Sequence, residues 1–183
     1  PTHGNVFNRF CSGDLPALSA FKFATFGFNG RIFMNGEEVS DGRAWAHIVS
    51  GDHSGPTYEP PRVGRPAFEN CVANPSTGLK TVVACLNDTS PTGQVYFYVG
   101  TKQRTGNPVE RAGLDNGTLY GVKIPGAPLE DRGVPFGSAV PFTLAPLGNV
   151  SGITPAAQTN LANSLGVTGF LRPEDGSWDP ANP

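Results

Sequence analysis

Residues Phe68 to Ile124 hold four strand-like runs separated by turn residues, and this stretch decides the predicted fold. The runs are AFENCVA (67–73), KTVVAC (80–85), QVYFYV (94–99) and GTLYGVKI (117–124). They are rich in β-branched and aromatic side chains, which favour strands. The NPSTG segment (74–78) carries the Pro and Gly of a turn between the first two runs. The pattern predicts an antiparallel four-stranded sheet, the form of a propeller blade.

The flanking sequence predicts further strands and one helix. Gly30 to Glu38 is expected to form a strand that ends in a Gly-Glu-Glu turn, with Trp45 to Val49 as its partner. A helix is predicted near 154–166, because Thr154 can cap it, Pro155 suits its first position and Gly166 suits its end. Residues 172–183 look like the first strand of a further blade. We therefore expect an all-β fold of propeller-like antiparallel blades over residues 1–183, either as one domain or as an incomplete propeller.

Composition limits the classes of function. With 24 Gly and 18 Pro among 183 residues, turns are dense and long helices are not expected. The net charge of -2 gives no basic surface, which argues against nucleic acid or an anionic membrane as the main partner. No run of 18 apolar residues occurs, so no transmembrane segment is predicted. The chain begins at Pro1 without a visible signal peptide, and we expect that its amino terminus has been processed or lost.

The three cysteines leave two alternatives open. Cys11, Cys71 and Cys85 are an odd number, which does not build a full disulfide framework. Cys71 and Cys85 flank the first hairpin of the predicted sheet and can pair if their registers oppose each other. The alternative is three buried free thiols.

Four segments together resemble the PhoX-type alkaline phosphatases and their relatives, which are secreted β-propellers. They are GRIFMNGEE (30–38), GRPAFE (64–69), GTLYGVK (117–123) and FLRPED (170–175). In that family, carboxylates at the ends of inner strands hold an iron and calcium cluster that binds phosphate. The resemblance implies metal ligands at Glu37, Glu38, Glu69 and Glu174, and a secreted or periplasmic location.

Two positions depart from the family pattern. Gly36 stands where the family has a metal-binding Cys, and Phe68 where it often has His. Glutamate oxygens are hard donors that suit calcium, whereas a thiolate binds softer metals. The resemblance therefore implies calcium first, and iron only if the site can do without the thiolate at position 36.

Two functions follow. The first is a metal-dependent phosphomonoesterase acting on a phosphate ester, in which the cations bind phosphate and activate an oxygen nucleophile. The second is a non-catalytic extracellular module that holds structural calcium and is completed by other copies or by another chain. Because the family thiolate is missing at position 36, we expect weak or absent turnover by this chain alone.

The individual carboxylates also have simpler interpretations. Glu37 and Glu38 are adjacent and would face opposite sides of a strand, where either can be a solvated surface group. A carboxylate at Glu69 has apolar neighbours and is costly to bury unless it is paired or bound to a metal, and a salt bridge to Arg62 or Arg65 is the alternative. Asp88 lies in a polar loop, where it either ligates an ion or closes an Asx-type turn.

Overall fold

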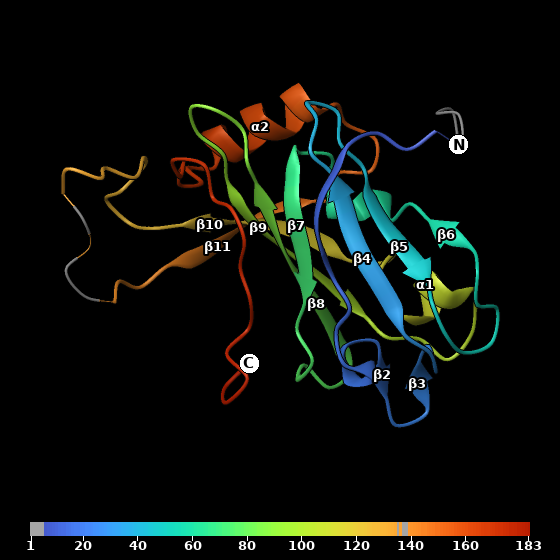
Figure 1. The fold of residues 1–183 in the computed structure, drawn as a ribbon. Coiled ribbons are helices and arrows are strands. Elements are labelled where there is room, and N and C mark those ends of the chain that lie inside the picture. The colour runs from blue at the N-terminus through green and yellow to red at the C-terminus, as the bar shows by residue number, and fades with distance from the viewer. Residues whose placement is uncertain (1–5, 135, 137–138) are drawn as a thin grey trace.

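Two antiparallel sheets form the body of the computed structural model, which describes residues 6–134, 136 and 139–183 (Figure 1). The larger sheet has the strand order β11-β10-β9-β8-β7, with the bounds β7 Phe68–Ala73, β8 Lys80–Asn87, β9 Val95–Thr101, β10 Thr118–Lys123 and β11 Thr143–Gly148. The smaller sheet has the order β1-β4-β5-β6, with the bounds β1 Phe10–Asp14, β4 Ile32–Glu37, β5 Ala44–Ile48 and β6 Thr57–Tyr58.

The remaining elements are short. β2 (Lys22–Phe23) and β3 (Phe26–Gly27) form a separate hairpin. The α-helices are α1 (Pro108–Arg111) and α2 (Pro155–Ser164). Two 3-10 turns span Leu18–Ala20 and Pro61–Val63.

The larger sheet confirms the four-stranded antiparallel arrangement predicted from residues 68–124. β7, β8, β9 and β10 are consecutive neighbours in chain order, and Cys85 lies between Cys71 on β7 and Tyr96 on β9. The fifth strand, β11, was not predicted, because its Pro146 and Gly148 resemble turn residues. Its position at the edge of the sheet explains why Pro is tolerated there, since one side of an edge strand needs no hydrogen-bond partner.

The smaller sheet confirms the predicted pairing of the two strands around residues 30–49. β4 and β5 are antiparallel, with Ile32 opposite Ile48. β1 was not predicted, because its residues Phe-Cys-Ser-Gly-Asp show no long apolar pattern, yet it pairs with β4 along the outer edge of this sheet. β1 and β4 also contact β7, which brings both sheets together along one seam.

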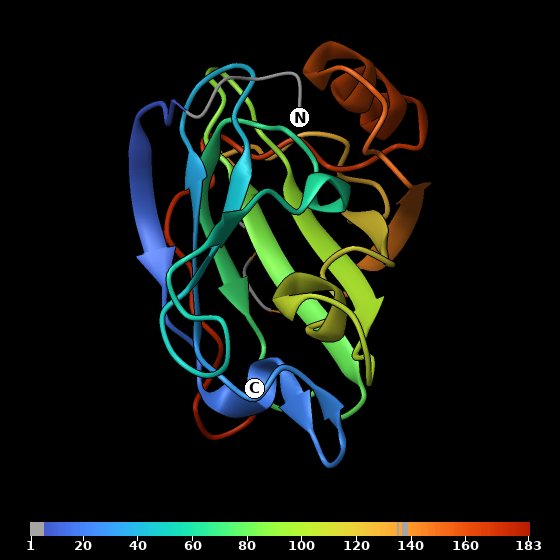
Figure 2. The same ribbon diagram turned by 90° about the vertical axis from the view of Figure 1, so that its right-hand side faces the viewer.

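The strands of the two sheets lie next to each other in Figure 2. One hydrophobic core draws on both sheets. Ile32 and Met34 from β4 are fully buried together with Phe68 from β7. Tyr96 and Tyr98 add two buried rings from β9, and the Tyr98 hydroxyl donates to Gly113 O at 2.9 Å. This core fixes the β1–β4–β7 seam from the inside.

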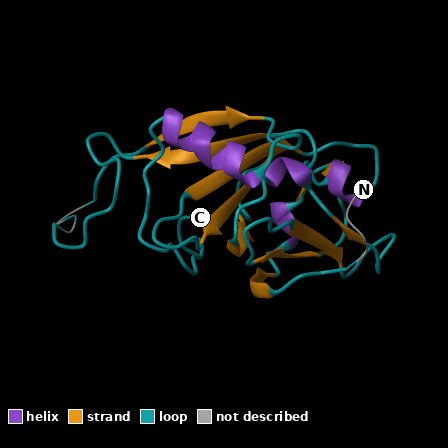
Figure 3. Ribbon diagram, turned by 90° about the horizontal axis from the view of Figure 1, so that it is seen from above, coloured by secondary structure: helices purple, strands orange, loops and turns teal. Residues whose placement is uncertain are grey.

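The predicted helix near 154–166 is confirmed as α2, which lies on the β11 side of the larger sheet (Figure 3). The Thr154 hydroxyl caps it by accepting from Ala157 N at 3.2 Å, and Gly166 follows its end with φ 72°. None of the helices in the described parts of the chain is long and apolar enough to cross a membrane.

The all-β antiparallel class is confirmed, whereas the described strands make two main sheets and the separate β2–β3 hairpin, with no closed ring of blades. Residues 172–183 do not form the further strand that their sequence suggested. They run over the larger sheet instead, where Trp178 Nε1 donates to Val72 O at 3.1 Å and the indole lies against Phe97.

Candidate metal centre

Cys11, Glu38 and Glu69 meet at the seam between the two sheets. One ligand atom from each lies within 4.8 Å of the other two. Cys11 comes from β1, Glu38 follows directly after β4, and Glu69 is the second residue of β7. Three strands that are distant in the sequence therefore supply one sulfur and two carboxylates to the same point.

A β-bulge directs Glu69 towards this point. The register between β7 and β8 shifts between Phe68 and Asn70, so Glu69 is the extra residue of β7. In a regular strand residues 68 and 71 would face opposite sides, but both Phe68 and Cys71 are fully buried in the core. The bulge thus lets Phe68 pack inward while Glu69 reaches across to β1.

Glu69 is a buried carboxylate whose hydrogen-bond partners are neutral. It is 6% exposed, and its Oε1 accepts from Cys11 Sγ at 2.9 Å and from Ser12 Oγ at 3.2 Å. In the described part of the chain no Lys, Arg or His forms an ion pair with it. A buried carboxylate normally has a charged partner or a metal, because the loss of water is costly. Glu69 therefore lacks a compensating positive charge among the described residues.

The salt bridge expected as an alternative for Glu69 is not formed. Arg62 Nη1 donates to Gly117 O at 3.2 Å, and Arg65 lies 3.5 Å from Asp41 and 3.8 Å from Glu59. Both guanidinium groups that the sequence offered to Glu69 are thus engaged elsewhere.

Cys11 supplies a thiol that the sequence analysis did not place in a site. Its hydrogen bond to Glu69, burial and the nearby negative charge raise the pKa of Cys11 to about 11. The thiol is therefore neutral at pH 7 and acts as a donor to the carboxylate. A bound cation would replace this proton, because metals bind the thiolate form.

Glu38 forms the outer side of the cluster. Its Oε1 lies 3.1 Å from Nη2 of Arg9, a residue whose side chain is 66% exposed. The backbone fixes the pair, since Glu38 N donates to Arg9 O and Arg9 Nη2 donates to Glu38 O, each at 2.8 Å. Glu38 is thus held close to the cluster while remaining reachable from solvent.

Glu37 has a different environment from its neighbour. It is 1% exposed, and Arg43 donates to its two oxygens from Nε at 2.9 Å and Nη2 at 2.8 Å. Asn8 N and Arg43 N donate to it as well. Burial alone would raise the pKa of Glu37, but these hydrogen bonds outweigh it and hold the pKa below its usual value. Because protein donors already occupy both oxygens, Glu37 serves as a buried ion-pair partner.

Glu174 lies outside the cluster. Its side chain is 63% exposed and stands 3.6 Å from Arg172. Arg172 itself binds Asp88 through both oxygens, at 2.8 and 2.6 Å, and this guanidinium lowers the pKa of Asp88. Asp88 is therefore an ion-pair partner in the structure, neither of the two roles that its loop position suggested.

The two departures from the family pattern contact each other. A Cβ atom at Gly36 would lie 2.2 Å from Phe68 Cβ and 2.5 Å from Phe68 Cγ, distances that no real side chain shows. Phe68 thus fills the space that a side chain at position 36 would need. The thiol near Glu69 comes from Cys11 on the neighbouring strand instead.

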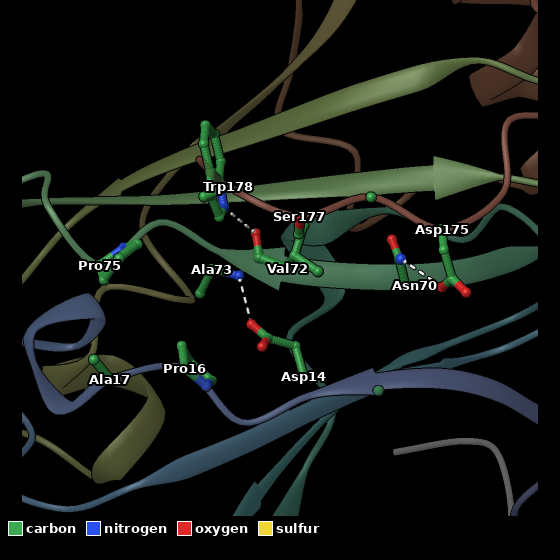
Figure 4. Close-up of a pocket in the computed structure, with 12 residues that line it drawn as sticks. Asp14, Pro16, Ala17, Asn70, Val72, Ala73, Pro75, Asp175, Ser177 and Trp178 are labelled. Carbon is green, nitrogen blue, oxygen red and sulfur yellow. Dashed lines mark hydrogen bonds between the residues drawn. The ribbon is translucent and has the colours of Figure 1, made fainter. Parts of the chain in front are cut away.

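A pocket of about 330 Å³ lies farther along the same seam (Figure 4). Asp14 on β1 accepts from Ala73 N at 3.0 Å, and Asp175 accepts from Asn70 Nδ2 at 3.0 Å. Asn70 Oδ1 is buried and has no hydrogen-bond partner among the described residues. Burial raises the pKa of Asp14. With two carboxylates on its wall, this pocket is a poor place for a phosphate.

No protein-family model, curated protein or solved structure matches this chain. The functional proposal therefore rests on the geometry of the site. Of the four predicted ligand residues, the structure brings Glu38 and Glu69 together and leaves Glu37 and Glu174 apart. Cys11 was missed because it is 58 residues from Glu69, and no spacing pattern links the two.

Proposed function

We propose that this chain is a metal-binding β protein of the PhoX-like kind and that Cys11, Glu38 and Glu69 hold its cation. The observation that carries the proposal is Glu69, a buried carboxylate whose partners are a thiol and a hydroxyl. A cation at this point would provide the missing positive charge. The likeness of four sequence segments to secreted propeller proteins supports the further proposals of a blade-like role for the larger sheet and a secreted or periplasmic location.

The donor set bears on the choice of metal. Two carboxylates alone suit calcium, but calcium sites normally use six to eight oxygens, and a thiol is not among them. One sulfur with two carboxylates suits a borderline metal such as iron or zinc better. Because Cys11 can supply a thiolate, iron is a candidate for the bound metal, although Gly36 cannot supply the thiolate that the family uses.

The first role of this site is phosphate chemistry. A bound cation supplies charge neutralisation for a phosphate ester and lowers the pKa of a bound water. Arg9 is the exposed guanidinium beside Glu38, and guanidinium groups bind phosphate oxygens in pairs. In this role Arg9 would leave Glu38 to orient the phosphate, and Glu69 would fix the cation from the buried side.

The second role is structural, with the cation joining β1, β4 and β7 and the module being completed by other copies or another chain. The observation that favours it is that the nearby guanidinium groups of Arg9 and Arg172 are already paired with carboxylates. A phosphate would have to displace those pairs. We therefore expect weak or absent hydrolysis of a generic phosphate monoester by this chain alone.

Thermal unfolding in the presence of metal or chelator tests the proposal. Glu69→Ala and Cys11→Ser should each lower the melting temperature in metal by more than in chelator, because ligand binding stabilises only the folded state that can bind. Glu174→Ala is the matched control and should behave like the parent chain in both conditions. An equal loss in metal and in chelator for Glu69→Ala would refute metal binding. Chelator-sensitive turnover of a phosphate monoester would decide for the first role over the second.

A further inference from the structure

Cys71 and Cys85 face each other across the hairpin formed by β7 and β8. They are direct register partners, and their Sγ atoms are 2.9 Å apart. Both side chains are fully buried in the core between the sheets. The contact is separate from the metal site, which uses Cys11.

The pair occupies the kind of register position that a disulfide can bridge. Asn74 N donates to Val82 O at 2.9 Å, so residues 74 and 82 are a hydrogen-bonded pair. Hydrogen-bonded and non-hydrogen-bonded pairs alternate along an antiparallel ladder. Counting back from this pair, Cys71 and Cys85 form a non-hydrogen-bonded pair, in which the Cα atoms are about 4.5 Å apart and the side chains come closest. This separation lies within the range that disulfides span.

We propose that Cys71 and Cys85 form a disulfide that staples β7 to β8, with a small-molecule disulfide such as oxidised glutathione as the oxidant. One thiolate attacks a sulfur of the oxidant, breaks its S–S bond and releases one glutathione thiolate. The second cysteine then attacks the mixed disulfide, forms the Cys71–Cys85 bond and releases the second glutathione. The two protein thiols lose two electrons to the oxidant, and their two protons end on the two glutathione molecules.

The burial of Cys71 and Cys85 determines the stage of folding at which the disulfide can form. Both cysteines are inaccessible in the folded chain, so the oxidant reaches them before the smaller sheet covers the core. The two residues are only 14 positions apart, and a hairpin with a short connection can form before the rest of the fold. The reaction therefore belongs to folding, and the folded reduced chain should be oxidised slowly.

The Cys71–Cys85 disulfide would hold β7, the strand that carries the candidate metal ligand Glu69, in register with β8. β7 is the edge of its sheet, and its bulge at Glu69 lies beside Cys71. A slip of one residue in the β7–β8 register would separate the two sulfurs and turn Glu69 away from Cys11. The bond would therefore hold the register on which the seam depends, whether or not a metal binds there.

Refolding the reduced, unfolded full chain in oxidised and reduced glutathione tests the proposal. We expect one free thiol out of three in denaturant, a mass lower by two hydrogens, and a cross-linked peptide pair that contains Cys71 and Cys85. In a Cys11→Ser chain the oxidised form should melt about 6–12 °C above the reduced form, as expected for a loop of about 15 residues in a chain of this size. A Cys11→Ser, Cys85→Ala chain is the matched control and should show no difference between the two redox conditions.

Several outcomes would overturn the proposal. They are three free thiols after refolding, a cross-link that includes Cys11, or an oxidised Cys11→Ser chain that melts no higher than its reduced form. If the control variant fails to fold, the thiol count and the peptide map of the unsubstituted chain still decide the question.

Discussion

The buried ion pair between Glu37 and Arg43 provides a sharp test of how the two adjacent glutamates differ. Arg43→Met removes the guanidinium but keeps an apolar stem of similar length. Glu37 would lose two charged hydrogen bonds, from Nε at 2.9 Å and Nη2 at 2.8 Å, while remaining 1% exposed. The variant thus leaves a buried carboxylate without its compensating charge.

The expected loss of stability in Arg43→Met depends on which contacts of Glu37 are removed and which remain. Breaking one side of a buried pair costs about 3–5 kcal/mol. The backbone donors Asn8 N and Arg43 N stay in place at 2.7 and 3.1 Å, so we expect the lower end of that range. A loss of about 3 kcal/mol corresponds to a melting temperature lower by about 6–12 °C.

The stability of the parent chain and that of Arg43→Met should depend differently on pH. The folded pKa of Glu37 lies below its usual value of 4.5, so the pair stabilises the parent chain above about pH 4.5, and that contribution is lost as the pH falls through the folded pKa. In Arg43→Met the guanidinium no longer lowers the pKa of Glu37, while burial still raises it and the two backbone donors still lower it, so the folded pKa rises relative to that of the parent chain. Arg43→Met therefore loses less stability than the parent chain as the pH falls. The difference between the two chains should be largest at pH 7 and should shrink by pH 5.

Urea unfolding at both pH values measures these differences. Arg9→Met is the matched control, because Arg9 forms an exposed pair with Glu38 and such pairs contribute less than about 1 kcal/mol. A loss below about 1 kcal/mol for Arg43→Met, or a loss that does not change between pH 7 and pH 5, would show that Arg43 does not compensate the charge of Glu37. With that result, Glu37 would again be a candidate metal ligand.

Three further predictions concern other positions. Burial lowers the pKa of Lys102 from 10.5 to about 8, so between these values the unfolded chain binds more protons than the folded chain and stability should rise with pH. Lys102→Met should remove this rise in urea titrations, and it also removes the hydrogen bond from Lys102 Nζ to Lys80 O. A pH profile that Lys102→Met leaves unchanged would contradict this. Gly36→Cys should cost about 3 kcal/mol or more in urea unfolding, because its Cβ would overlap Phe68; a fully stable variant would show that the space exists. Thr154→Ala should cost about 1 kcal/mol by loss of the α2 cap, and an unchanged urea midpoint would argue against that cap.

The larger sheet could be predicted because its strands carry their own signals. Val82, Tyr96 and their neighbours are β-branched or aromatic, and turn residues separate the runs. β1 and β11 gave no such signal, since their conformation comes from pairing with β4 and β10. Pairing with a distant strand can impose an extended conformation on residues that do not prefer it.

The candidate site was only partly predictable for a related reason. Glu69 could be found because a carboxylate among apolar neighbours needs a partner. The separate roles of Glu37 and Glu38 depend on Arg43 and on Cys11, whose positions are set by the tertiary fold. Cys11 itself carries no local motif, and only the pairing of β1 with β4 brings it to the carboxylates.

Elemental analysis of the purified chain measures directly whether Cys11, Glu38 and Glu69 hold a metal. We predict that the parent chain holds a bound metal, and that Cys11→Ser and Glu69→Gln lower its content while Glu174→Gln does not. Iron together with calcium would support the phosphomonoesterase role, and calcium alone would support the structural role. A parent chain that binds no metal after incubation with iron, zinc and calcium, or a metal content that Glu69→Gln leaves unchanged, would rule out a metal site at Glu69.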